Sequence, residues 1–203
     1  MEHVHDGFTE KELSALHETE LFRLKYLLID KVVVQFNHLS PKVKEVLEKH
    51  HLPAEIAKAR VRIFRGDNYK HLPYAVMDYP ALYTRENSFA YRTMFWWGNF
   101  FSCTLYLHGT YLELYRKNLQ QGIHELKGKD FYFCVNETPW QYYYEKDNYI
   151  AVDELLKKKG AAEKLIGERG FLKLSRYVKI TEWKKVNQLC IDSLGLLLHA
   201  AGA

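Results

Sequence analysis

The sequence predicts an α+β fold, in which helices at both ends of the chain pack on an antiparallel β-meander of about five strands. Apolar residues recur at helical spacing before residue 50 and after residue 181, and they alternate at strand spacing between these regions. Residues 91–109, YRTMFWWGNFFSCTLYLHG, contain seven aromatic rings and no Pro, Lys, Asp or Glu. This composition indicates the central hairpin of the sheet.

The length of 203 residues fits one domain, 1–203, with a sizeable core. We expect a helical N-terminal part (1–55), a sheet with one inserted helix (56–136) and a mostly helical C-terminal part (137–203). Internal repeats and low-complexity linkers are absent from the sequence.

The N-terminal part predicts two helices. Thr9 and Glu12 have capping-box spacing, which predicts a helix from Glu10 to about residue 37. Its apolar stripe comprises Leu13, Leu16, Leu21, Leu24, Leu27 and Leu28. Ser40 and Pro41 look like a cap and a first helical residue, so a second helix is expected to run to about residue 50.

Five strands follow in the predicted fold. They cover residues 59–65, 72–79, 87–97, 100–108 and 131–135, with a turn at 66–68 and Pro80 ending the second strand. A helix is expected over 111–126, a loosely helical region over 153–170, and a final helix from residue 181. Residues 138–144 carry both a capping-box pattern and a tyrosine run, so helix and strand remain alternatives there.

Gly98 and Asn99 predict a two-residue hairpin loop, because both residues tolerate the positive φ angles of primed turns. In that register Trp97 pairs with Phe100, and Tyr91 pairs with Tyr106. One predicted face carries Arg92, Met94, Trp96, Phe101, Cys103, Leu105 and Leu107. The other carries Tyr91, Thr93, Phe95, Trp97, Phe100, Ser102, Thr104, Tyr106 and His108. A three-residue loop would mix these two faces.

The second face, which mixes rings with hydroxyl groups, predicts a pocket for a small aromatic or anionic ligand. Its expected ligand-binding residues are Tyr91, Trp97, Thr104 and Tyr106, together with the nearby Arg92 and Asp78. Plain packing beneath a helix is the alternative for these rings. Arg92 on the apolar face needs an anion, either a carboxylate such as Asp78 or Glu113 or the bound ligand itself. A small-molecule-binding domain is therefore the leading hypothesis.

His108 is the best acid–base candidate, because it ends a strand just before a helix. The second hypothesis is accordingly an enzyme with His108 as its acid–base group. It requires a carboxylate within hydrogen-bond reach of the imidazole. The third hypothesis is a protein-interaction or homo-oligomerisation module, in which the aromatic face meets a second chain.

Motifs for cofactors and metals are missing from the sequence. The chain has no dinucleotide glycine fingerprint, no His-Glu-x-x-His and no paired Cys-x-x-Cys. Glu48 and His51 form one Glu-x-x-His, where a two-metal bundle needs two, and His3 and His5 could only chelate adventitiously. We expect no cofactor and no metal.

Charge and cysteine content indicate the class of protein. The net charge of +4 is mildly basic and lacks the Lys/Arg stripe of a nucleic-acid binder. The first residues do not resemble a signal peptide, and the apolar runs are too short to span a membrane. Cys103, Cys134 and Cys190 are odd in number and widely spaced, so we expect reduced thiols in a soluble, cytoplasmic protein.

Overall fold

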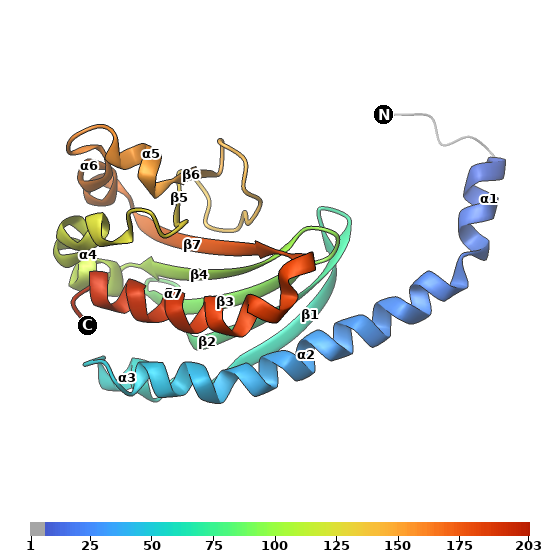
Figure 1. The fold of residues 1–203 in the computed structure, drawn as a ribbon, viewed down its shortest axis with the longest axis horizontal. Helices are drawn as coiled ribbons and strands as arrows, with labels where there is room; N and C mark the ends of the chain where they lie inside the picture. Colours follow the sequence, from blue (N-terminus) through green and yellow to red (C-terminus); the bar gives the residue numbers. More distant parts are fainter. Residues whose placement is uncertain (1–6) are drawn as a thin grey trace.

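A computed structural model describes residues 7–203, and His3 and His5 lie outside the described residues. Mixed helices and one antiparallel sheet confirm the α+β class (Figure 1). The sheet has seven strands in the order β1-β2-β3-β4-β7-β5-β6, where about five in a meander were expected. The last strand in the sequence, β7, lies between β4 and β5, so the sheet is not a simple meander.

The elements have the following bounds. The helices are α1 (Glu10–His17), α2 (Thr19–Leu47), α3 (Ala54–Ala57), α4 (Thr110–Gly122), α5 (Val152–Leu156), α6 (Ala161–Glu168) and α7 (Val186–Ala200), with 3-10 helices η1 (Ile123–Leu126) and η2 (Ile180–Lys185). The strands are β1 (Arg62–Tyr69), β2 (Leu72–Tyr83), β3 (Ser88–Trp96), β4 (Phe100–His108), β5 (Tyr132–Cys134), β6 (Tyr149–Ala151) and β7 (Phe171–Lys179).

The capping box of Thr9 and Glu12 is confirmed, but the two predicted N-terminal helices are divided differently. The helix breaks at Glu18, and α2 then continues without interruption through Pro41. Proline removes the amide that would bond to the carbonyl of Asn37, and the hydroxyl of Ser40 donates to that carbonyl instead, at 3.1 Å. A local hydrogen bond thus compensates for the proline that looked like a helix start.

Two predicted strand ends are wrong. Residues 66–68 belong to β1, and the turn is formed by Lys70 and His71, whose φ angles are 49° and 66°. Pro80 does not end β2, because the pairing of β2 with β3 shifts between Asp78 and Ala81. This irregularity accommodates a residue that has no N–H to donate.

Strands β6 and β7 were not predicted. The segment that forms β7, FLKLSRYVK, has Lys173 and Arg176 among its apolar residues and follows Gly167 and Gly170. Charged residues among apolar ones, preceded by glycines, also occur in a loosely helical region, so the sequence did not indicate a strand here. The strand pairs with β4 along its full length, from Phe100 opposite Lys179 to His108 opposite Phe171.

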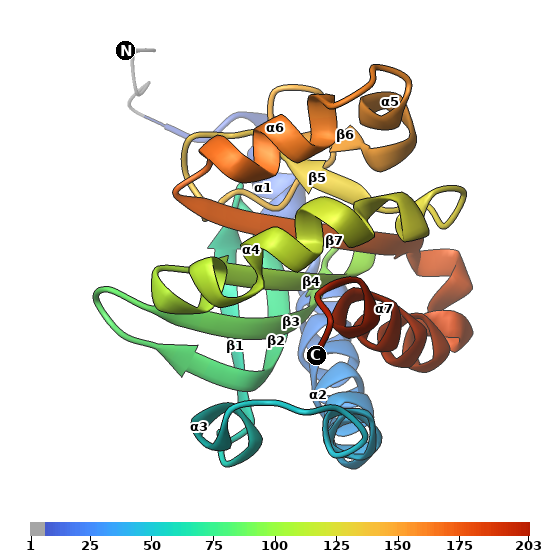
Figure 2. The same cartoon turned by 90° about the vertical axis from the view of Figure 1, so that its left-hand side faces the viewer.

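Helices α2 and α7 lie side by side across one face of the sheet, which we call the helix-covered face (Figure 1). Its strand residues include Met77, Tyr91, Phe101, Leu105 and Leu174, which share a core with Phe36 of α2 and Leu194 of α7. Figure 2 shows α4 between α6 and α7 at the end of the molecule. At the end of α4, Gly122 lies so close to Ala200 of α7 that a Cβ would not fit. The missing side chain therefore permits the close approach of α4 to α7.

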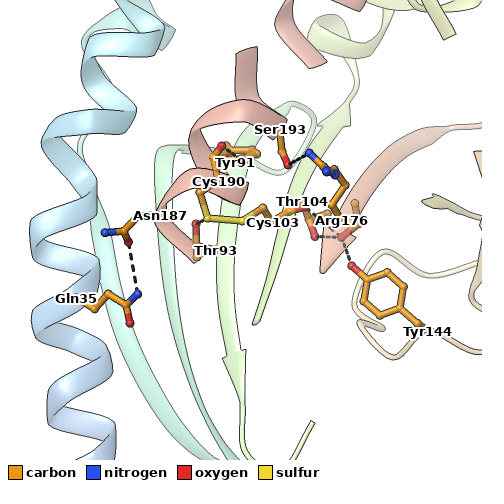
Figure 3. Close-up of a disulfide and its surroundings, with 11 residues drawn as sticks. Gln35, Tyr91, Thr93, Cys103, Thr104, Tyr144, Arg176, Asn187, Cys190 and Ser193 are labelled. Atoms are coloured by element: carbon orange, nitrogen blue, oxygen red, sulfur yellow. Dashed lines mark hydrogen bonds between the residues drawn. A yellow bond between two sulfur atoms is a disulfide. The ribbon is translucent and has the colours of Figure 1, made fainter. Parts of the chain in front are cut away.

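A disulfide joins Cys103 of β4 to Cys190 of α7, with a Cα–Cα distance of 5.6 Å (Figure 3). Both cysteines are buried, and the hydroxyl of Tyr91 donates to the carbonyl of Cys190 at 2.6 Å. The prediction of three reduced thiols is therefore wrong for this pair, while Cys134 is free and buried. A separation of 87 residues hides a contact that only the packing of α7 on β4 creates. The cytoplasmic location, which used the reduced thiols as support, stays a prediction.

Within residues 7–203, none of the helices combines the length and the apolar character needed to span a bilayer.

Candidate functional site

The hairpin between β3 and β4 has a three-residue loop, Trp97 to Asn99, and not the predicted two-residue loop. Trp96 pairs with Phe100, and Arg92 pairs with Thr104. The amide of Trp97 donates to the carbonyl of Pro73 on β2 at 3.0 Å, and the amide of Asn99 closes the turn on Trp96 at 3.1 Å. The extra loop residue shifts one strand against the other, so the predicted faces are exchanged between the strands.

Five of the seven predicted site residues therefore share one face of the sheet. Asp78, Arg92, Thr104, Tyr106 and His108 lie on the side opposite to α2 and α7, which we call the loop-covered face. Tyr91 lies on the helix-covered face and is fully buried, and Trp97 lies in the hairpin loop. The structure thus brings Arg92 together with the hydroxyl residues and separates Tyr91 and Trp97 from them.

Asp78 is the internal anion that Arg92 requires. The guanidinium donates from Nε to Oδ1 and from Nη2 to Oδ2, both at 2.8 Å, and the two side chains are 12% and 2% exposed. Burial alone would lower the pKa of Arg92, but the hydrogen bonds with Asp78 raise it above its usual value. Glu113, the other carboxylate considered, pairs with Arg116 on α4.

Residues 135–148, between β5 and β6, form the cover of this face, and we call them the cover loop. This segment is neither the helix nor the strand considered for 138–144. Arg92 donates from Nη1 to the hydroxyl of Tyr142 at 2.7 Å, and the amide of Tyr142 donates to the hydroxyl of Tyr69 at 2.7 Å. The hydroxyls of Tyr144 and Ser175 are hydrogen-bonded, and Thr104 bonds to Ser175 at 2.6 Å. The ring of Tyr142 therefore occupies the place beside Arg92 where a ligand was expected.

Lys173 of β7 is buried beneath the same loop and was missed by sequence reasoning. Its Nζ donates to the carbonyls of Pro139 and Gln141, each at 2.7 Å, and lies 4.0 Å from the ring centre of Tyr142. Within residues 7–203 no carboxylate forms a salt bridge with it. Burial lowers the pKa of Lys173 to about 7. The available signal was a lysine between two leucines, Leu172 and Leu174, but it required knowing that residues 171–179 form a strand.

His108 has no orienting carboxylate in the part of the chain that the structure describes. It is half-buried at the end of β4, opposite Ser88 on one side and Phe171 on the other. The described salt bridges of histidine join His124 to Glu163 and His199 to Glu125. The geometry expected of an acid–base pair at His108 is therefore missing from residues 7–203.

The N-terminal helices project from the body of the molecule, and we call residues 8–28 the arm (Figure 1). The residues from 7 to 28 are all exposed except the half-buried Lys25. Nine large apolar side chains lie on the arm with 42–70% of their surface exposed: Phe8, Leu13, Leu16, Leu21, Phe22, Leu24, Tyr26, Leu27 and Leu28. The predicted leucine stripe thus forms a helix but is not buried, and the buried stripe of α2 begins at Ile29.

An apolar groove lies where the arm joins the body, between α2, the sheet and η2. It has a volume of about 490 Å³ and is lined by Leu28, Lys31, Val32, Gln35, Phe95, Phe101, Ile180 and Trp183. We call it the arm groove. Trp183 is 52% exposed although it is a large ring, and Lys31, Lys179, Lys184 and Lys185 are exposed around it. Leu21, Leu24, Leu28 and Val32 continue from the arm into the groove at helical spacing.

The described residues include no group of three or more His, Cys, Asp or Glu side chains placed to hold a metal ion. Comparison of the chain with protein-family models, with curated proteins and with solved structures gives no match. Function therefore has to be inferred from the arrangement of this chain's own residues.

Proposed function

We propose that the protein is a protein–protein interaction module and that the arm is its docking element. The single observation that carries this proposal is the set of nine exposed large apolar side chains on the arm, of which eight lie on α1 and the first part of α2 and one, Phe8, lies just before α1. Folded monomers rarely expose contiguous apolar patches above a few hundred Å². Nine side chains exposing on the order of 100 Å² each match the ~800 Å² that a stable interface buries on each partner.

The form of the arm supports docking against protein. An amphipathic helix presents leucines at positions three and four apart, which is the arrangement that enters an apolar groove. Leu21, Leu24 and Leu28 have this spacing in α2, and Leu13 and Leu16 have it in α1. The outer part of the arm is α1, a helix of 8 residues without buried side chains. Such a short helix is marginally stable in water by itself, so α1 gains order when the arm docks.

A photo-crosslinking amino acid at position 16 tests the proposal in an extract of the source cells. We expect crosslinks from position 16 to one defined protein, which is then purified and titrated against the full chain. Leu16→Glu should abolish this binding, because a carboxylate would be desolvated at the interface.

Leu114 provides a matched control, because it is 54% exposed and lies on α4, at the end of the body opposite to the arm (Figures 1 and 2). Neither a crosslinker at position 114 nor Leu114→Glu should affect the same complex. Equal crosslinking from positions 16 and 114, or binding that survives Leu16→Glu, would contradict the docking role of the arm.

A small anionic ligand beneath the cover loop is the second candidate function, and Lys173 favours it. Its ammonium group is hydrogen-bonded to two backbone carbonyls and lies against ring faces, but no counter-charge pairs with it in the described residues, which favours an anion as ligand. Thr104, Tyr106 and Ser175 lie on the same face and could hydrogen-bond to such a ligand. The cover loop would have to move for the ligand to enter.

Thermal unfolding in the presence of inorganic phosphate and of small aromatic carboxylates tests this candidate. A ligand bound at this face should stabilise the wild-type protein but not Lys173→Met or Tyr106→Ala. Stabilisation that persists in both variants would place the ligand elsewhere.

A further inference from the structure

We propose that the partner of the arm is a second copy of this chain, and that each arm lies in the arm groove of the other copy. This inference rests on the proposed docking function and adds the identity of the partner. The arm and the arm groove are the two complementary surfaces of one molecule, one convex and apolar, the other concave and apolar. An exchange of arms covers both surfaces in a closed, two-fold dimer.

Charge complementarity favours a second copy as the occupant. Residues 8–21 carry Glu10, Glu12, Glu18 and Glu20 against the single basic residue Lys11, which gives the outer arm a net charge of −3. Lys31 lines the groove, and the segment 179–185 that contributes Ile180 and Trp183 carries Lys179, Lys184 and Lys185 against Glu182, so these residues have a net charge of +3. Opposite potentials of this kind orient two surfaces and suppress wrong partners.

The chain cannot place its own arm in its own groove. Residues 19–47 form one continuous helix, so the segment from 19 to 28 is held in line with the groove residues Val32 and Gln35. Only α1 could fold back, at Glu18. Its eight residues span about 12 Å, while the groove residues of α2 extend from Leu28, about 14 Å along the helix from Thr19, to Gln35, about 24 Å along it. A second molecule must therefore supply the arm that fills the groove.

Two-fold symmetry defines the position of the axis. In such a dimer, if residue i of one copy contacts residue j of the other, then j also contacts i. Antiparallel arms that place Leu16 against Val32 also place Leu21 close to Leu28. The midpoint of the first pair is Leu24, and that of the second lies between Leu24 and Lys25, so the two copies of Leu24 should face each other across the axis.

Sedimentation of the purified full-length chain over a range of micromolar concentrations tests the proposal. We expect a species of twice the 24.1 kDa chain mass. Leu16→Glu in the arm and Trp183→Ser in the groove should each raise the dimer dissociation constant at least about thirtyfold, as expected for buried hot spots. Leu114→Glu and Trp140→Ser are the matched controls, since Leu114 is 54% and Trp140 55% exposed, and both should leave it unchanged.

Mixing the two variants provides a second test that does not depend on folding defects. Leu16→Glu retains an intact groove, and Trp183→Ser retains an intact arm. A mixture should form dimers with one complete arm–groove contact at concentrations where neither variant dimerises alone. A mixture that stays monomeric while both variants are folded by circular dichroism would contradict the reciprocal exchange.

Charge-reversal variants test whether the acidic residues of the arm meet the lysines beside the groove. Glu18→Lys with Glu20→Lys in the arm, or Lys31→Glu with Lys184→Glu beside the groove, should each weaken the dimer about fivefold. The chain that carries all four reversals should recover most of the affinity. If the variant with all four reversals dimerises more weakly than either double variant, these charges do not meet in the dimer.

Cysteine crosslinking locates the axis. Leu24→Cys should form an intermolecular disulfide under mild oxidation, because the native cysteines are buried or already paired. Leu114→Cys should not. Failure of Leu24→Cys to crosslink in a confirmed dimer would overturn the proposed geometry.

The two proposals fail differently. A wild-type chain that stays monomeric at high micromolar concentration overturns self-association, and crosslinking from position 16 to a different protein would then still support the docking function. A dimer that is insensitive to Leu16→Glu and Trp183→Ser uses another surface and overturns the arm exchange directly.

Discussion

The arm and the cover loop are both rich in large apolar or aromatic side chains, but they differ in what surrounds those side chains. The arm is almost entirely helical, and its leucines are exposed. The cover loop has no helix or strand, yet Tyr142 is 9% exposed and is fixed by hydrogen bonds to Arg92 and Tyr69. In these two regions, a helical backbone does not imply buried side chains, and an irregular backbone does not imply exposed ones.

The reason for the difference is the availability of a partner surface. The cover loop lies on a sheet face whose buried cations, Arg92 and Lys173, need the oxygen atoms that the loop supplies. Most of the arm extends beyond the sheet, so its helices satisfy their own backbone hydrogen bonds while the large apolar side chains stay exposed. Only its last residues meet the body, where Lys25 pairs with Asp67 of β1.

Asp78→Asn should be the most destabilising change at the cover loop. It leaves the guanidinium of Arg92 buried without a counter-charge, a change that costs about 3–5 kcal/mol. Chemical denaturation measures the loss. A free energy of unfolding within about 1 kcal/mol of the wild type would mean that the loop opens and hydrates Arg92 at low cost.

Lys173 should make stability depend on pH. Its folded pKa of about 7 lies below its ordinary value of 10.5, so between these values the unfolded chain binds more protons and stability rises with pH. The gain should reach about 2 kcal/mol from about pH 7 to about pH 9. Lys173→Met should remove this rise, which denaturation at several pH values would detect. An identical rise in Lys173→Met would assign it to other groups.

Tyr142→Phe should have a smaller effect, because it deletes one hydroxyl and keeps the ring. The lost bond is accepted from the charged Arg92, so we expect destabilisation of about 2 kcal/mol. Hydrogen exchange should show faster opening of residues 135–148 in this variant. Tyr143→Phe serves as the control, because the hydroxyl of Tyr143 donates to Asp147 of the same loop and not to the sheet.

Leu24→Ala in the arm should change the unfolding free energy of the monomer by less than about 0.5 kcal/mol, because the side chain is 43% exposed and alanine favours helix. Phe36→Ala, on the buried part of the same helix, should cost about 3–5 kcal/mol. Measurements on dilute protein would compare them. A large effect of Leu24→Ala would mean that the arm packs on its own body.

The central hairpin shows how far the candidate site was predictable. The alternation within each strand was correct, since Arg92, Met94 and Trp96 share one face and Thr104, Tyr106 and His108 also share one face. Their combination was wrong, because one amide hydrogen bond from Trp97 to Pro73 lengthens the loop by a residue. Pairing of Arg92 with Asp78 was among the predicted alternatives and is observed.

Two further features were not predicted, because they too depend on contacts between distant segments. Lys173 and the disulfide of Cys103 with Cys190 depend on β7 and α7 lying beside β4, far away in the sequence. No local pattern reports such contacts. The arm groove likewise combines α2 with Phe95, Phe101 and Trp183, which lie on three separate segments.

Spacing within a few residues was enough to predict the α+β class, the capping box at Thr9, a strand over residues 100–108 and the polar alternation within each strand of the central hairpin. Long-range packing fixes which strand faces combine, which leucines of α2 are buried and which loop covers Arg92. These features depend on contacts between distant segments, whose free energy is absent from any local pattern. The arm is the clearest case, because the same helical spacing of leucines continues from the buried part of α2 into solvent.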